Sequence, residues 1–320
     1  MRTKTKVWLI IAVTLVLLGG ILFAGVMSTL GWDFTKLSTE KFETNTYEIS
    51  EAFDAISMDT DTADIVFAAS DDGICKVVCY EQENAKHSAV VENNTLTIRV
   101  ADQREWYQYI GINFSTPKIT VYLPENPYTA LLIKESTGAI EIPKEFKFED
   151  VDISLSTGAV KFFASVSDVL KINTSTGAIH VENISAGALD LSVSTGKVTV
   201  TGVDCGDVKI NVSTGKTNMT DIRCKNLISS GDTGDISLKN VIATEKFSIE
   251  RSTGDVKLEK SDAAEIYIET DTGDVTGTLL TEKVFIAETD TGRVDVPKTT
   301  TGGKCEIETD TGNIKITISN

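Results

Sequence analysis

Apolar and polar residues alternate with a period of two over most of the chain after residue 50, on both sides of regularly spaced glycines. The second and fourth residues after each glycine are apolar in nearly every case, as in Val160 and Phe162. The seventh and fifth residues before the glycine follow the same rule, as in Val151 and Ile153. This alternation places successive side chains on opposite faces of a strand, so each unit is predicted to hold two short strands with one buried face.

The glycines end the tripeptides Ser-Thr-Gly or Asp-Thr-Gly and recur every 19 or 20 residues. A fixed period below about 50 residues is typical of repeat architectures, whose units bury their apolar faces on one another. Ser or Asp followed two residues later by Gly also suits a type II turn, in which the third residue has a positive φ. The predicted structural turn residues are Gly138, Gly158, Gly177, Gly196, Gly215, Gly234, Gly254, Gly273, Gly292 and Gly312.

Apolar residues seven positions after a glycine predict a third bend in each unit; they are Ile184, Val203, Ile222, Val241 and Leu280. A single coil of this size buries too few side chains to offset the backbone entropy of ordering it, so the coils must stack. The predicted fold is all-β, a parallel β-solenoid (β-helix) with about 19–20 residues per coil, preceded by one transmembrane helix. Equivalent residues of successive coils should then form columns, including the threonines from Thr137 to Thr311.

The N-terminus predicts a membrane anchor. Residues 1–6 form a basic tail with Arg2, Lys4 and Lys6, and residues 7–32 contain no charged side chain, which is enough for one span. The basic residues place the N-terminus in the cytoplasm, so the rest of the chain is expected outside it. A cleaved signal peptide is the alternative, although the apolar run is longer than usual for one and lacks a small-residue cleavage site.

Between the anchor and the regular repeats, two regions are predicted. Residues 33–50 are polar and are expected to form a stalk. Residues 51–135 are expected to form N-terminal capping coils with hairpin insertions, beginning with a degenerate coil in which Ala63 replaces the repeat glycine. Strands are predicted near 74–80, 95–100 and 118–123. The regular solenoid is predicted to occupy residues 136–320.

An aromatic segment at 104–114 contains Trp106, Tyr107 and Tyr109. Exposed aromatic side chains often mark binding surfaces, which makes this segment a candidate partner-binding site. The same residues would equally serve as a cap over the open end of the solenoid, whose strand edge must be covered. We favour a capping role for this segment, and partner binding is the alternative.

The chain has 320 residues and a net charge of −17. This charge argues against nucleic acid as a partner, because a strongly acidic surface repels it. Towards the C-terminus the residue before Thr-Gly changes from Ser to Asp, and Asp271, Asp290 and Asp310 are predicted to form a column beside Asp274. Clustered carboxylates favour Ca²⁺, so a calcium site is one interpretation, and turn capping without a cation is the other.

Other candidate chemistry is sparse. Asp-Thr-Gly also occurs in aspartic proteases, but here it follows the coil period and Ser replaces Asp in six of the ten repeats, which argues against a protease. Cys205 and Cys224 both lie nine residues after a repeat glycine, so they should neighbour each other in adjacent coils. A disulfide between them is a hypothesis, and buried free thiols are the alternative.

The anchor, the degenerate DTAD coil, the strands NNTLTI and PKITVYLP and the STG/DTG repeats together resemble the putative-adhesin β-strand-repeat family of unknown function, which includes LiaG-like bacterial cell-envelope proteins. The resemblance covers residues 50–320. It implies a bacterial cell-envelope protein with a link to envelope-stress signalling. Together with the N-terminal anchor, this predicts a single-pass protein of the bacterial cytoplasmic membrane with an extracytoplasmic C-terminal domain.

From these features we expect no enzyme and no cofactor other than the calcium considered above. No phosphate-binding loop is present, and neither His87 nor His180 lies near a candidate catalytic nucleophile in the sequence. The expected function is a membrane-anchored binding or scaffold protein for an envelope protein or glycan. The alternatives are an accessory regulator of an envelope-stress system and, less favoured, a polysaccharide-active enzyme.

Overall fold

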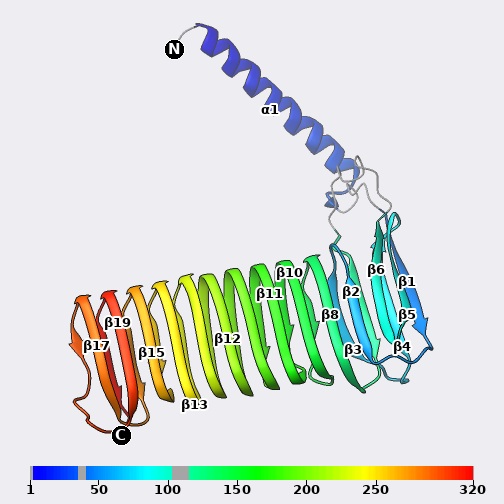
Figure 1. Ribbon diagram of the computed structural model, residues 1–320. Helices are drawn as coiled ribbons and strands as arrows, with labels where there is room; N and C mark the ends of the chain where they lie inside the picture. Colours follow the sequence, from blue (N-terminus) through cyan, green and yellow to red (C-terminus); the bar gives the residue numbers. More distant parts are fainter. Residues whose placement is uncertain (1–2, 35–40, 103–114, 320) are drawn as a thin grey trace.

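The computed structural model describes residues 3–34, 41–102 and 115–319 and consists of one helix and a long stack of β-coils (Figure 1). The elements are α1 (Thr3–Thr29), β1 (Phe42–Ile49), β2 (Ala55–Asp59), β3 (Asp64–Ala69), β4 (Cys75–Gln82), β5 (Ala85–Glu92), β6 (Thr95–Asp102), β7 (Lys118–Leu123), β8 (Pro127–Thr137), β9 (Ile140–Ile142), β10 (Lys147–Phe162), β11 (Ser165–Glu182), β12 (Ser185–Thr233), β13 (Ile236–Thr253), β14 (Val256–Glu259), β15 (Asp262–Thr272), β16 (Val275–Leu279), β17 (Lys283–Thr291), β18 (Val294–Asp295), β19 (Gly303–Thr311) and β20 (Ile314–Ile318).

Successive coils pair in parallel with a shift of one repeat. Strand β10 aligns with β11 so that Thr157 faces Thr176 and Gly158 faces Gly177. The same register continues from β11 to β12 and from β12 to β13. These pairings confirm the predicted parallel β-solenoid and its threonine and glycine columns.

The core is made of the inward columns that the alternation predicts. Ile153, Ile172, Leu191 and Ile210 occupy equivalent positions and are fully buried. The predicted third bend is present where Ile222 pairs with Val241.

Leu280 breaks the rule of the third bend, because it is 41% exposed whereas Leu279 is fully buried. In other coils, the residue six positions after the repeat glycine has a positive φ, as in Asn183, Asp221 and Asn240. The chain turns at this residue, so the residue that follows it points into the core. Leu279 lies at the equivalent position, but its φ is not positive and the chain does not turn there. The strand alternation that begins at Val275 therefore continues and places Leu279 in the core.

The predicted type II turn at the repeat glycines is wrong. Eight of them have φ between 131° and 158°, whereas the third residue of a type II turn lies near +80°. The left-handed corners lie six residues later, at Asn183, Gly202, Asp221, Asn240 and Lys260, with φ between 49° and 63°. Asn, Asp and Gly tolerate this conformation best, which accounts for most of these residue types.

The repeat glycines are required by backbone packing between coils. A Cβ atom on Gly196 would lie 1.7 Å from the carbonyl oxygen of Gly177, and one on Gly215 would lie 1.6 Å from that of Gly196. No side chain fits at such a distance. The glycine column is therefore a line of direct backbone contact along the stack.

At both ends the coils do not stack in chain order. The coil of β2 and β3 lies between β6/β7 and β8/β9. At the other end, β19 and β20 lie between β15/β16 and β17/β18 (Figure 1). The prediction that successive repeats are spatial neighbours is therefore wrong for the C-terminal coils, whereas the degenerate repeat of β2 and β3 does pair with the next repeat, β8 and β9.

A buried ion pair joins two coils across the inserted one. The Lys283 Nζ lies 2.6 Å from the Asp262 Oδ1, with both side chains buried. Lys283 begins the outermost strand β17 and pairs in register with Gly303 of the inserted strand β19. The Asp262 Oδ2 also accepts hydrogen bonds from the backbone N–H groups of Leu280 and Thr281. These contacts fasten the outermost coil to β15.

Antiparallel pairings close the N-terminal end. Strand β1 pairs with β4, β4 pairs with β7, and β5 pairs with β6. Strands β4, β6 and β7 confirm the predicted ones, whereas β5 was not predicted. The predicted stalk at 33–50 is wrong over residues 42–49, because β1 belongs to the sheet.

Helix α1 contains a stretch, Thr5–Thr29, that is long and apolar enough to span a membrane. A signal sequence would meet the same criteria, so the helix by itself shows neither cleavage nor orientation.

One carboxyl group is buried in the first regular coil. Glu135 is 4% exposed, accepts a hydrogen bond from the backbone N–H of Ala63 at 3.0 Å and bonds to the hydroxyl of Thr60. Burial raises the pKa of Glu135 to about 8, against the opposing effect of its backbone donors. The side chain lies beside the degenerate coil, where the repeat glycine is replaced.

We expect Gly196→Ala to lower the free energy of unfolding by about 2 to 5 kcal/mol, because the added Cβ meets the neighbouring backbone and φ is 151°. The matched control is Gly202→Asn, since Asn183 and Asn240 occupy the same corner in other coils. Denaturant titration of both variants measures the effect. Equal stability of the two would contradict the requirement for glycine at the backbone contact.

We expect part of the stability to depend on Glu135 between pH 4.5 and 8. A carboxyl whose pKa is raised on folding contributes fully below its unfolded value of 4.5, and this contribution is lost as the pH rises through about 8. Melting temperatures of the wild type and Glu135→Gln should therefore diverge over this range, with only the wild type losing this component. Parallel pH profiles would show that Glu135 does not titrate in this way.

Candidate functional site

A polar groove runs along the corner of the stack that precedes the repeat glycines. We define it by two outward columns, the residues two and four positions before each glycine. The first column, in spatial order, is Ser136, Ser156, Ser175, Ser194, Ser213, Asp232, Ser252, Asp271, Asp310 and Asp290; the second is Lys134, Ser154, Asn173, Ser192, Asn211, Ser230, Glu250, Glu269, Glu308 and Glu288. All of these side chains are at least partly accessible to solvent.

The groove contains two hollows of similar size and different chemistry. The hollow nearer the N-terminus has a volume of about 430 Å³ and is lined mainly by Ser and Asn, including Ser156, Asn173 and Ser175. The other has a volume of about 390 Å³ and is lined by acidic side chains that include Asp232 and Asp271. We call these the neutral half and the acidic half of the polar groove. The neutral half can hydrogen-bond to uncharged polar ligands, and the acidic half attracts cationic groups.

Arg251 lies beneath the acidic half, in a core column that is otherwise mostly apolar or Thr. It is 3% exposed, and its Nη1 donates to the carbonyl oxygen of Val212 at 2.7 Å. Gly231 lies between them and makes the space, because a Cβ there would be 1.8 Å from the Nη1. Burial lowers the pKa of Arg251, while the charge of Asp232 acts in the opposite direction. Arg251 was not among the predicted site residues, although a charged side chain at an inward position of the alternation was the available signal.

The predicted calcium column is arranged differently from the prediction. Asp310 pairs in register between Asp271 and Asp290, because β19 is inserted between β15 and β17. Asp274 lies between the repeat glycine and strand β16, where its Oδ1 accepts the backbone N–H of Asn313 at 2.7 Å. Equivalent side-chain to backbone bonds link Asp235 to Asp255 and Asp255 to Asp274. These bonds give the Asp274 column a capping role, and calcium at Asp271, Asp310 and Asp290 stays a prediction.

The other predicted sites are the disulfide between Cys205 and Cys224 and the aromatic segment at 104–114. Cys205 and Cys224 are free thiols in the structure, so the predicted disulfide is not formed in it. Parallel neighbours in adjacent coils are about 4.8 Å apart, whereas disulfides require Cβ atoms about 3.8 Å apart. Burial raises the pKa of both thiols to about 12. Trp106, Tyr107 and Tyr109 lie outside the residues that the structure describes.

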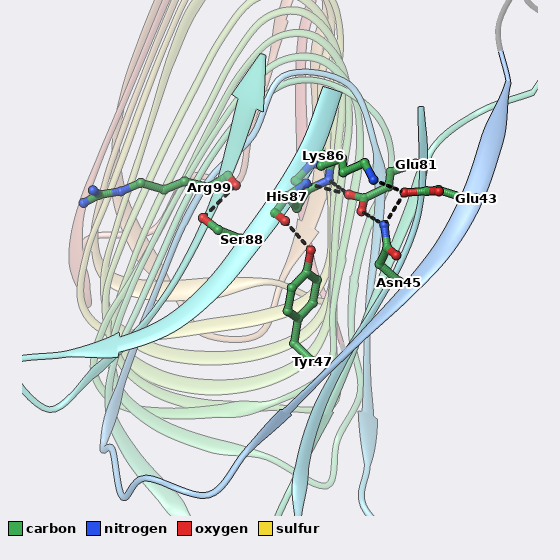
Figure 2. A network of polar contacts seen from close by, with 8 residues as sticks. All are labelled: Glu43, Asn45, Tyr47, Glu81, Lys86, His87, Ser88 and Arg99. Carbon is green, nitrogen blue, oxygen red and sulfur yellow. Dashed lines mark hydrogen bonds and ion pairs between the residues drawn. The ribbon is translucent and has the colours of Figure 1, made fainter. Parts of the chain in front are cut away.

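A second polar cluster lies inside the N-terminal cap (Figure 2). Glu81 on β4 is fully buried, and its Oε2 lies 2.6 Å from both the backbone N and the Nδ1 of His87 on β5. Its Oε1 accepts from the Asn45 Nδ2 at 2.6 Å, and the hydroxyl of Tyr47 donates to the carbonyl oxygen of His87 at 2.5 Å. The cluster therefore ties β1, β4 and β5 together.

This cluster was not predicted from the sequence, because strand β5 was not predicted. The spacing of Cys79 and Glu81 places both on the buried face of β4. The alternation of Ala85, His87 and Ala89 does the same for β5. A carboxylate and a histidine within these buried alternations were the signal that was available.

Comparison with known proteins places the chain in a family. The model of the Toastrack DUF4097 family matches residues 53–223 and 203–320. No curated protein matches the chain.

Solved structures share the fold. A protein from Parabacteroides distasonis described as a putative lipid binding protein is 18% identical, with a TM-score of 0.51, over 87% of this chain and 98% of its own. A putative adhesin from Parabacteroides merdae is 13% identical, with a TM-score of 0.51, over 74% of this chain and 96% of its own. At these identities the similarity shows the fold alone. Since the family model covers nearly all of the chain beyond residue 52, the chain belongs to the Toastrack DUF4097 family.

Proposed function

We propose that the protein is a non-enzymatic binding or scaffold protein of the bacterial cell envelope, held in the cytoplasmic membrane by its N-terminal helix. The observation that carries this proposal is the polar groove, which extends over the regular coils on a hydrogen-bonded parallel stack. A long, pre-organised surface suits an extended partner, because little entropy is lost in ordering the protein when it binds.

The chemistry of the groove supports a partner that is polar along its length. Ser and Asn side chains in the neutral half both donate and accept hydrogen bonds, as sugar hydroxyls and peptide groups require. The acidic half adds attraction for basic groups. A protein segment or a glycan of the envelope fits this surface, whereas an anionic polymer such as nucleic acid would be repelled.

A binding role also agrees with the surroundings of the histidines. The structure pairs His87 with Glu81 inside the cap and His180 with Glu182 at 2.8 Å on the surface. Cys79 lies close to His87, but burial raises the pKa of its thiol to about 12, which is the opposite of what a nucleophile needs. Nucleophilic catalysis by this pair is therefore disfavoured.

A photo-crosslinking residue placed at Ser175 tests the groove as the binding surface. In cells, we expect a covalent adduct from Ser175 in the neutral half and little from Lys161, which is also exposed but lies on the strand after the glycine. A position at Asp271 reports on the acidic half in the same way. Adducts that form equally from Lys161 and Ser175, or from neither, would argue against the groove.

The membrane anchor predicts an uncleaved chain. We expect the intact mass of protein isolated from membranes to include residues 1–32, and we expect protease added to spheroplasts to digest the coils while sparing the basic N-terminal tail. A mature chain that begins near residue 25–30 would instead identify the helix as a signal peptide.

A further inference from the structure

Three side chains that commonly bind transition metals converge inside the N-terminal cap. Cys79 and Glu81 project from the same face of β4, and His87 projects from β5. Their donor atoms all lie within 4.8 Å of one another. Cys79 and Glu81 are fully buried and His87 is 6% exposed. Among the residues that the structure describes, this is the one such group of His, Cys and acidic side chains.

We propose that Cys79, Glu81 and His87 form a binding site for one transition-metal ion, with Zn²⁺ the ion that best fits the donors. A thiolate, an imidazole and a carboxylate are the ligands of zinc sites, whereas calcium and magnesium select oxygen ligands alone. Three protein ligands leave a fourth position for water. The inference is independent of the function proposed for the polar groove.

The geometry requires a small adjustment. In a tetrahedral zinc site, two N or O ligands are roughly 3.3 Å apart, as bond lengths of about 2.0–2.1 Å imply. The His87 Nδ1 and the Glu81 Oε2 are now 2.6 Å apart and share a proton in their hydrogen bond. Separation by less than 1 Å would bring these two donor atoms to the spacing of zinc ligands, and the Cys79 sulfur lies within 4.8 Å of both. The bonds of Glu81 to Asn45 and to the backbone N–H of His87 would still orient the carboxylate.

The charges balance in the bound state. A divalent ion with one thiolate, one carboxylate and a neutral imidazole is uncharged overall, which suits a buried site. Zinc binds a cysteine as the thiolate, so binding releases the thiol proton of Cys79.

The surroundings supply support and access. The hydroxyl of Tyr47 holds the backbone carbonyl of His87, and Lys86 pairs with Glu43 at 2.5 Å at the edge of the cluster (Figure 2). His87 and Gln82 also line a cavity of about 260 Å³ that gives an ion a route to the imidazole. A bound ion would join β4 to β5 and so strengthen the cap.

Cobalt binding to the full-length chain in detergent tests the proposal. Co²⁺ reports thiolate ligation through a charge-transfer absorption band, and the chain should be unfolded and refolded with Co²⁺ so that slow entry into a buried site cannot hide binding. We expect one Co²⁺ per chain, displacement by Zn²⁺, and a higher melting temperature with either ion. A wild-type chain without the band at pH 8 overturns the proposal.

Matched variants separate this site from other thiols and from a purely structural Glu81–His87 pair. We expect Cys79→Ser to abolish the band and Glu81→Gln to weaken binding at least tenfold, although Gln retains a hydrogen-bond acceptor. Cys75→Ser, on the same buried face of β4, and His180→Gln, which removes the other histidine, should leave binding unchanged. Co²⁺ binding that survives Cys79→Ser would also overturn the proposal.

Discussion

Direct backbone contact at the repeat glycines is the constraint on which the rest of the structure depends. Each glycine lies so close to the carbonyl oxygen of the neighbouring coil that a Cβ would approach it to about 2 Å or less in most coils. This contact fixes the register between coils. The register in turn aligns the inward columns into a continuous core and the outward columns into the polar groove, so the surface chemistry follows from one position in the repeat.

Most of the stack could be predicted because the period and the alternation are local properties of the chain. Val160 and Phe162 lie inward and Ser156 outward as the pattern requires. The turn type was mispredicted, because Thr-Gly fits several backbone conformations and only the contact between coils selects one. The order of the terminal coils was not predicted either. All repeats have similar strand edges, so the period of the sequence does not determine which two coils pair with each other.

The buried ionisable groups lie where the stack departs from regularity. Glu135 lies beside the coil that lacks a repeat glycine, and Arg251 fills the space left by Gly231. Lys283 and Asp262 meet across the inserted strand, and Glu81 meets His87 in the cap. Buried ion pairs contribute little net stability on average, but an unpaired partner is costly, so such pairs disfavour alternative arrangements. In this protein we interpret them as determinants of coil order.

The insertion of β19 and β20 has a consequence for how the chain folds. Coils from β8 to β16 can be added one after another as the chain emerges, because each pairs with the coil that precedes it. The coil of β17 and β18 has no such partner, since its neighbour is the segment that follows it in the sequence. The far end of the solenoid therefore cannot close until residue 318 is available, which makes closure a checkpoint for a full-length chain.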